Sequence, residues 1–136
     1  MLFPARNDDR SHEFPRHRGA LTTKPYRFGY CASPSAEQGD AWPTIKHDLE
    51  TGRQWTFDHG PGRAAGEPVF IGKQGRTEED AGWLVTFVHD QAAGSAEFVV
   101  MDAEDIERGY VAKVTLPQRV PFGFHGNWVS DERVAP

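Results

Sequence analysis

The amino-acid sequence predicts an all-β protein built from short antiparallel strands. Fourteen glycines and ten prolines interrupt its 136 residues, and this density leaves little room for a helix of more than three turns. Between these residues lie short stretches rich in Val, Phe, Ile, Leu and Trp, which favour pleated strands. The separators are polar and turn-like, so we expect strands to pair with their neighbours in sequence.

The first half of the chain predicts one small sheet. Residues before Pro25 are polar and broken by proline, so 1–24 are expected to be mostly irregular. Three strands are then predicted, at Tyr26–Cys31, Thr44–Leu49 and Gln54–Asp58. The second and third strands are joined by Glu50-Thr51-Gly52-Arg53, a tight-turn sequence that predicts a β-hairpin.

The second half predicts a four-stranded sheet. After a glycine-rich loop over residues 60–66, strands are expected at Pro68–Ile71, Gly82–His89, Glu97–Asp102 and Tyr110–Leu116. The segments Trp83–Val88 and Phe98–Met101 are apolar on both faces, as in strands packed between neighbouring sheets. Asp105–Gly109 predicts one helical turn before the last strand.

Consecutive short strands joined by polar turns form the antiparallel sheet of a β-propeller blade. The chain holds at most two such blade-like units, and two blades do not close a ring. Its length is that of one ordinary domain, which would bury roughly two thirds of its unfolded surface.

Charge and cysteine content exclude several classes of function. The formal net charge is −5 and the lysines and arginines are scattered singly, so we expect no nucleic-acid partner. Cys31 is the only cysteine, which excludes an internal disulfide and a Cys-x-x-Cys metal knuckle. With no signal-peptide core and no apolar run of about 20 residues, we expect a cytoplasmic protein that at most touches a membrane surface.

The six histidines include no local pair spaced for a metal on one helix or strand. Five are expected to be solvated or turn residues: His12, His17, His47, His59 and His89. His125 differs because small and aromatic residues flank it, in Pro121-Phe122-Gly123-Phe124-His125-Gly126-Asn127-Trp128. If its ring is buried its nitrogens need partners, so it is either a hydrogen-bonded core residue or a metal ligand.

Two carboxylates stand beside proline-fixed, apolar backbone: Glu13 in His12-Glu13-Phe14-Pro15-Arg16 and Glu67 in Gly66-Glu67-Pro68-Val69-Phe70. Each is either a surface charge or an acceptor for the Nδ1 proton of a histidine whose other nitrogen faces a metal. The acidic run Glu78-Glu79-Asp80 is expected to be a solvated loop. No nucleophile elbow, phosphate-binding glycine loop or EF-hand loop occurs.

Five motifs occur in an order typical of one enzyme family: Glu13-Phe14-Pro15-Arg16, Tyr26-Arg27-Phe28-Gly29-Tyr30, Gly66-Glu67-Pro68-Val69-Phe70, Glu79-Asp80-Ala81-Gly82-Trp83-Leu84 and Phe122-Gly123-Phe124-His125-Gly126. From about Glu13 to Trp128, the chain resembles the C-terminal part of the carotenoid cleavage oxygenases. That family includes apocarotenoid oxygenases, lignostilbene dioxygenases and the retinoid isomerohydrolase of the eye.

The resemblance implies a seven-bladed β-propeller, capped on one face, with one Fe(2+) on its axis held by four histidines. Three glutamates of the family each orient one of these histidines. His125 matches the last iron ligand, and Glu67 and Glu13 match two of the glutamates. By analogy Glu67 pairs with His125, so Glu13 would orient a histidine that this chain does not contain. Three aromatic residues would help to wall an apolar substrate tunnel: Phe122, Phe124 and Trp128.

Family members are several times longer, and the blades carrying their other three iron-binding histidines have no counterpart in this chain. One imidazole cannot hold Fe(2+) usefully, so the chain alone is expected to be inactive. The leading hypothesis is the C-terminal part of a dioxygenase that uses O2 to cleave a conjugated double bond of a carotenoid, apocarotenoid or stilbene, with a complementing N-terminal chain as a candidate partner.

The alternative hypothesis is a stand-alone, non-catalytic β module that binds an apolar ligand or a protein partner. A slice of a propeller exposes blade faces and strand edges that its neighbours would cover, and this predicts poor solubility for the isolated chain.

Overall fold

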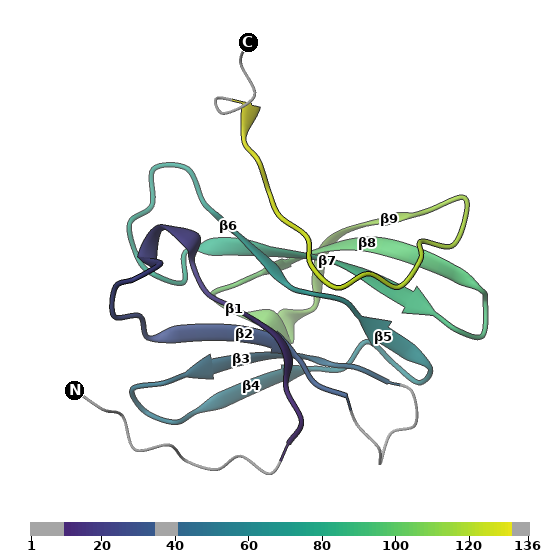
Figure 1. Cartoon of the computed structure of the whole chain (residues 1–136), viewed down its shortest axis with the longest axis horizontal. Helices are drawn as coiled ribbons and strands as arrows, with labels where there is room; N and C mark the ends of the chain where they lie inside the picture. The colour runs from purple at the N-terminus through teal and green to yellow at the C-terminus, as the bar shows by residue number, and fades with distance from the viewer. Residues whose placement is uncertain (1–9, 35–40, 132–136) are drawn as a thin grey trace.

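The computed structural model describes residues 10–34 and 41–131, which form two antiparallel β-sheets and two short 3-10 helices. The prediction of an all-β fold with antiparallel, blade-like sheets is confirmed. Figure 1 shows the two sheets packed against each other, with the C-terminal segment crossing back along the second sheet before it leaves the molecule.

The first sheet has the strand order β1-β2-β3-β4. Its strands are β1 (Glu13–Arg16), β2 (Phe28–Ala32), β3 (Thr44–Asp48) and β4 (Gln54–Phe57). The predicted hairpin is present, because β3 pairs antiparallel with β4. In its turn, the Asp48 carboxylate accepts hydrogen bonds from the backbone N–H groups of Glu50 and Thr51. Gly52 has a φ of 75°, a conformation that glycine adopts without steric cost.

The expectation of an irregular N-terminal segment misses two elements within the described residues, β1 and the 3-10 helix η1 (Gly19–Leu21). β1 is an edge strand, where a proline does not break a ladder hydrogen bond. Its register shifts between Glu13 and Arg16, and Phe14 lies in the left-handed region with a φ of 56°. Residues 1–9 lie outside the described part of the chain.

The second sheet has the order β5-β7-β8-β9, and β6 also pairs with β7. Its strands are β5 (Arg63–Ala65), β6 (Val69–Gly72), β7 (Gly82–Asp90), β8 (Ser95–Asp102) and β9 (Tyr110–Thr115). All except β5 correspond to predicted strands, and no end differs from its predicted position by more than two residues. The predicted helical turn is the 3-10 helix η2 (Ile106–Arg108). The expectation of a loop over residues 60–66 is wrong for β5.

β5 and β6 occupy successive parts of one edge of β7, so together they form one interrupted strand. β5 pairs with Val88–Asp90 and β6 with Gly82–Val85. The interruption is Gly66-Glu67-Pro68. The Gly66 N–H still donates to the Phe87 carbonyl at 2.8 Å, whereas proline has no N–H to donate. Glu67 therefore lies outside the hydrogen-bonded ladder.

The hydrophobic core lies between the two sheets. Its buried members are Tyr30, Leu84, Met101, Ala103 and Ile106. The ring of Tyr30 in β2 stacks on that of Phe70 in β6, with 5.7 Å between the centroids. Gly82 makes room for Phe70, because a Cβ at this position would lie 2.2 Å from the phenyl ring. Three of the five sequence motifs therefore interlock in this core.

Two carboxylates of the acidic run before β7 are structural, which corrects the expectation of a solvated loop for Glu79 and Asp80, whereas Glu78 is exposed as expected. Glu79 Oε1 accepts hydrogen bonds from the backbone N–H groups of Arg27 and Phe28, at 2.6 Å and 2.7 Å. Asp80 forms an ion pair of 2.7 Å with Lys46, which is buried. Both carboxylates therefore fasten the β6–β7 connection to the first sheet.

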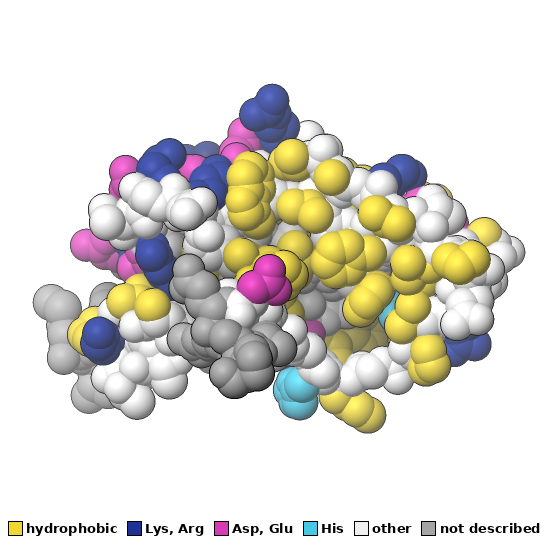
Figure 2. Space-filling view, turned by 90° about the horizontal axis from the view of Figure 1, so that it is seen from above, with side chains coloured by type: hydrophobic (Ala, Val, Ile, Leu, Met, Phe, Trp, Pro, Cys, Tyr) yellow, Lys and Arg dark blue, Asp and Glu magenta, His cyan; other side chains and the backbone are white. Residues whose placement is uncertain are grey.

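Large apolar side chains are exposed on the described surface, among them Phe87, Val111, Val114, Phe122, Phe124 and Trp128. Phe87 of β7 is 41 % exposed, so one face of this apolar strand is only partly covered by described residues. Figure 2 shows hydrophobic side chains spread over the face from which the C-terminal end rises. No helix among the described residues has the length and apolar character needed to cross a membrane.

Candidate functional site

A buried carboxylate holds the exposed histidine of the C-terminal segment. Glu67 Oε1 lies 3.1 Å from Nδ1 of His125, and Glu67 Oε2 accepts a hydrogen bond from the Gly126 N–H at 2.7 Å. The side chain of Glu67 is 6 % exposed and that of His125 is 76 % exposed. One carboxylate thus fixes both the imidazole and the backbone beside it.

The partner of Nδ1 decides what this imidazole can do. An ionised carboxylate only accepts hydrogen bonds, so Nδ1 of His125 is the donor and a neutral ring carries its lone pair on Nε2. Histidines that bind metals commonly use this arrangement, in which a carboxylate fixes the tautomer and the ring orientation. The pair can therefore supply one oriented nitrogen ligand.

Strand β1 of the first sheet reaches the same place. Arg16 Nη1 lies 3.4 Å from Glu67 Oε1, and Arg16 Nη2 donates to Asn127 Oδ1 at 3.4 Å. The ring of Phe14 meets that of His125 edge to face, with 6.1 Å between centroids. Three segments therefore meet here: β1, the interruption that holds Glu67, and the C-terminal segment that holds His125. The left-handed backbone of Phe14 and the register shift of β1 lie at this meeting point.

Glu13 lies elsewhere on β1. It is exposed at the start of the strand, opposite Ala32. In the described part of the chain, the hydrogen-bond partner of His125 is Glu67 and not Glu13.

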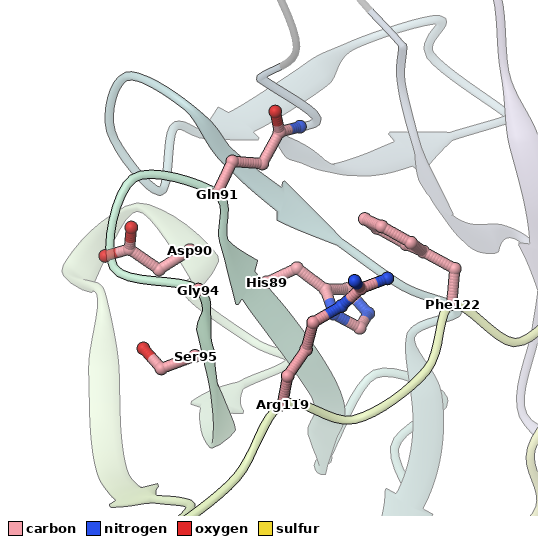
Figure 3. Close-up of a pocket in the computed structure, with 7 residues that line it drawn as sticks. All are labelled: His89, Asp90, Gln91, Gly94, Ser95, Arg119 and Phe122. Carbon is pink, nitrogen blue, oxygen red and sulfur yellow. The ribbon is translucent and has the colours of Figure 1, made fainter.

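The C-terminal segment is anchored a second time on β7. Figure 3 shows Arg119 and Phe122 reaching over His89. The rings of Phe122 and His89 lie 4.2 Å apart, and the Arg119 guanidinium is 5.2 Å from the Phe122 centroid. Burial, and then the positive charge of Arg119, lower the pKa of His89. A neutral His89 therefore packs against the segment that carries His125.

His59 also differs from the expectation of a solvated turn residue, because it is buried. Its Nδ1 lies 2.7 Å from the Tyr110 hydroxyl of β9, and its Nε2 lies 2.9 Å from the Thr44 hydroxyl of β3. Burial is the main cause that lowers the pKa of His59 to about 4. This ring is a neutral hydrogen-bonded link between the two sheets.

The remaining histidines are half-buried rather than solvated. Two of them, His12 and His47, meet Cys31 in a cluster whose potential ligand atoms all lie within 4.8 Å of one another. Sequence spacing could not reveal this cluster, because strand pairing and the segment before β1 bring the residues together. Within residues 10–34 and 41–131 it is the only group of three or more potential ligands found, so the described part of the chain provides no complete metal site around His125.

Comparison with known proteins assigns the chain to a family. Residues 4–130 match the protein-family profile described as "RPE65: Retinal pigment epithelial membrane protein". The rice protein "9-cis-epoxycarotenoid dioxygenase NCED1, chloroplastic" is 52 % identical over 129 residues, which cover 87 % of this chain and 19 % of that protein. The "Apocarotenoid-15,15'-oxygenase" of Synechocystis is 32 % identical over 118 residues, covering 85 % of this chain and 24 % of the relative.

Solved structures agree with these matches. The crystal structure of cobalt-substituted Synechocystis ACO superimposes with a TM-score of 0.82 at 32 % identity, over 88 % of this chain and 26 % of that one. The chain thus spans about a quarter or less of the length of these relatives. The sequence similarity extends over nearly the whole chain, and the two sheets superimpose on the solved structure. Together these matches show that the chain belongs to the carotenoid cleavage oxygenase family.

Proposed function

We propose that this chain is the C-terminal part of a dioxygenase that cleaves a conjugated carbon-carbon double bond with O2 and gives two carbonyl products. The substrate would be a carotenoid, an apocarotenoid or a stilbene. Relatives named as carotenoid dioxygenases and an apocarotenoid oxygenase support the reaction class. In this proposal residues 1–136 act as one C-terminal unit of a propeller, in the cytoplasm.

The observation that carries the proposal is the contact of 3.1 Å between Glu67 and Nδ1 of His125. The carboxylate is almost completely buried although the imidazole is exposed, and the same carboxylate also holds the neighbouring backbone N–H. A surface ion pair would not need a buried acceptor with two partners on the histidine's own segment. This geometry supports the proposal that His125 is a ligand held in position by Glu67.

His125 fits one ligand of an iron site, because Glu67 orients its imidazole, but among the described residues it belongs to no group of three or more potential ligands. The remaining histidines would come from other parts of the complete propeller. Bound Fe(2+) would supply the activation of O2 beside the alkene. Glu67 would keep the proton on Nδ1, direct Nε2 of His125 toward the metal and place a negative charge behind an uncharged ligand.

Other residues of the chain would shape the surroundings of His125. Arg16 contacts Glu67 and Asn127, so it ties the carboxylate to the C-terminal segment. The exposed Phe122, Phe124 and Trp128 would help to wall an apolar substrate path. Glu13 would orient a histidine supplied by another segment, in the role that Glu67 has for His125.

A segment exchange tests this function. The matched segment of the Synechocystis apocarotenoid oxygenase is replaced by this chain, and cleavage of an apocarotenoid under air is measured beside the isolated chain. We expect cleavage by the exchanged protein and none by the isolated chain. A folded exchanged protein without activity would contradict the proposal.

The alternative is a non-catalytic β module that binds an apolar ligand or a protein partner, which the exposed apolar face favours. The two functions differ in the behaviour of the isolated chain. A monodisperse, iron-free monomer with a cooperative melting transition favours the module. Poor solubility, relieved when a complementing N-terminal segment is co-expressed, favours the dioxygenase part.

A further inference from the structure

Three metal-ligating side chains meet on the first sheet, in a group that does not include His125. The Cys31 Sγ lies 3.4 Å from Nε2 of His47, and the rings of His12 and His47 meet edge to face with 4.7 Å between centroids. One ligand atom from each of the three residues lies within 4.8 Å of the others. They come from β2, from β3 and from the chain immediately before β1.

Strand register explains the juxtaposition. Cys31 lies opposite Ile45, and His47 lies opposite Gly29. Side chains alternate between the two faces of a strand, so Cys31 and His47 are diagonal neighbours on one face of the sheet. Gly29 has no side chain to occupy the space beside His47. β1 pairs with β2 from the other side, with Glu13 opposite Ala32, and this brings the adjoining His12 to the same region.

The spacing is close to that of a bound zinc ion. With Zn–S bonds of about 2.3 Å and Zn–N bonds of about 2.0–2.1 Å, two ligand atoms of a tetrahedral site lie about 3.3–3.6 Å apart. The distance between Cys31 and His47 is already in this range. The other separations are at most 4.8 Å, so a bound ion would draw these atoms together by about 1.5 Å or less.

Burial and ligand chemistry select the kind of metal. Cys31 is 3 % exposed, and Nε2 of His12 is shielded from solvent. One thiolate and two imidazoles suit a borderline metal ion such as Zn²⁺, and not Mg²⁺ or Ca²⁺, which prefer oxygen ligands.

An entry path is present. The same three residues line a surface pocket together with His17 and Tyr26, whose rings stack at 4.6 Å. An ion held by the three side chains would therefore keep a fourth position open toward the pocket, for water or a small ligand.

We propose that His12, Cys31 and His47 form a Zn²⁺ site with one open coordination position. It is separate from the ligand role proposed for His125. Binding would replace the thiol proton of Cys31 by the metal, with release of that proton to solvent and no change of oxidation state. The pairing of β2 with β3 and with β1 brings the three residues of this site together.

Cobalt titration of the purified 136-residue chain tests the site, because Co²⁺ replaces Zn²⁺ and gives a thiolate charge-transfer band in the near ultraviolet. Cys31 is the only cysteine, so the band can arise from no other residue. We expect a saturable band at one Co²⁺ per chain, displaced by Zn²⁺, and absent from Cys31→Ser.

The histidine roles are tested by His12→Gln and His47→Gln, each of which should weaken cobalt binding at least tenfold, while His125→Ala should leave the band unchanged. Circular dichroism of each variant reports whether the sheets remain folded. If the wild-type chain gives no thiolate band, the proposal is overturned, whatever the variants show. Unchanged affinity in folded His12→Gln and His47→Gln would overturn the assignment equally.

Discussion

Acidification should destabilise the chain through His59. This ring is buried between the sheets, and its two nitrogens are hydrogen-bonded to the hydroxyls of Tyr110 and Thr44. Hydroxyl groups can accept as well as donate, so protonation would not remove these partners. Its cost is the burial of a positive charge, and burial accordingly lowers the pKa of His59 from 6.5 to about 4.

The sign and size follow from proton linkage. The pKa of His59 is lower in the folded chain than in the unfolded chain, so the unfolded state takes up the proton first as the pH falls. The stabilisation is present above the unfolded pKa of 6.5 and is lost as the pH falls toward the folded pKa of about 4. Between pH 7 and pH 5 this one group should lower the free energy of unfolding by about 2 kcal/mol.

Denaturant unfolding of the wild-type chain and of His59→Gln at both pH values measures this contribution. Carboxylates with lowered pKa, such as Asp48 and Asp102, also lose stabilisation in acid, and both proteins share that loss. The wild-type chain should therefore lose about 2 kcal/mol more than the variant. An equal loss in the two proteins would refute the assignment of a buried neutral His59.

Three further substitutions test the packing and the candidate site. Gly82→Ala should cost about 2–3 kcal/mol in denaturant unfolding, because the added Cβ would overlap the ring of Phe70 and the backbone carbonyl of Ile71 in β6. A variant as stable as the wild-type chain would contradict the interlocked core. Glu79→Ala should cost about 2 kcal/mol, because the backbone N–H groups of Arg27 and Phe28 at the start of β2 would lose their acceptor. As a control, Glu78→Ala at the exposed neighbouring position should cost under about 0.5 kcal/mol. Glu67→Gln should speed hydrogen exchange of the Gly126 amide by roughly tenfold, because a charge-assisted hydrogen bond is weakened; an unchanged rate would show that this carboxylate does not hold the segment.

The strands that the sequence predicts are those with their own apolar or turn signal. The hairpin β3–β4 has a tight turn, and β7 and β8 are long apolar runs. β5 has no such signal, because Arg63-Ala64-Ala65 is short and poor in strand-forming residues. It is held by pairing with β7 and by backbone hydrogen bonds to Trp42. β1 likewise depends on β2, and its proline is acceptable only because the strand lies at a sheet edge.

The histidines show why single positions mislead. His59 follows β4 in a glycine-containing loop, which is typical of a surface residue, but its partners come from β3 and from β9, 51 residues away in sequence. Composition left His125 open between core residue and ligand, and the resemblance to a family supplied its pairing with Glu67. The contact depends on the interruption between β5 and β6, which local propensity does not reveal.

The central claim is that His125 is an iron ligand oriented by Glu67, and iron content measures it most directly. In the Synechocystis oxygenase carrying this chain in place of its matched segment, we predict one iron per complete propeller. His125→Ala should abolish iron loading, Glu67→Gln should weaken iron affinity roughly 10–100-fold, and the matched control His17→Ala should load normally. Full iron content in a folded His125→Ala protein would contradict the account.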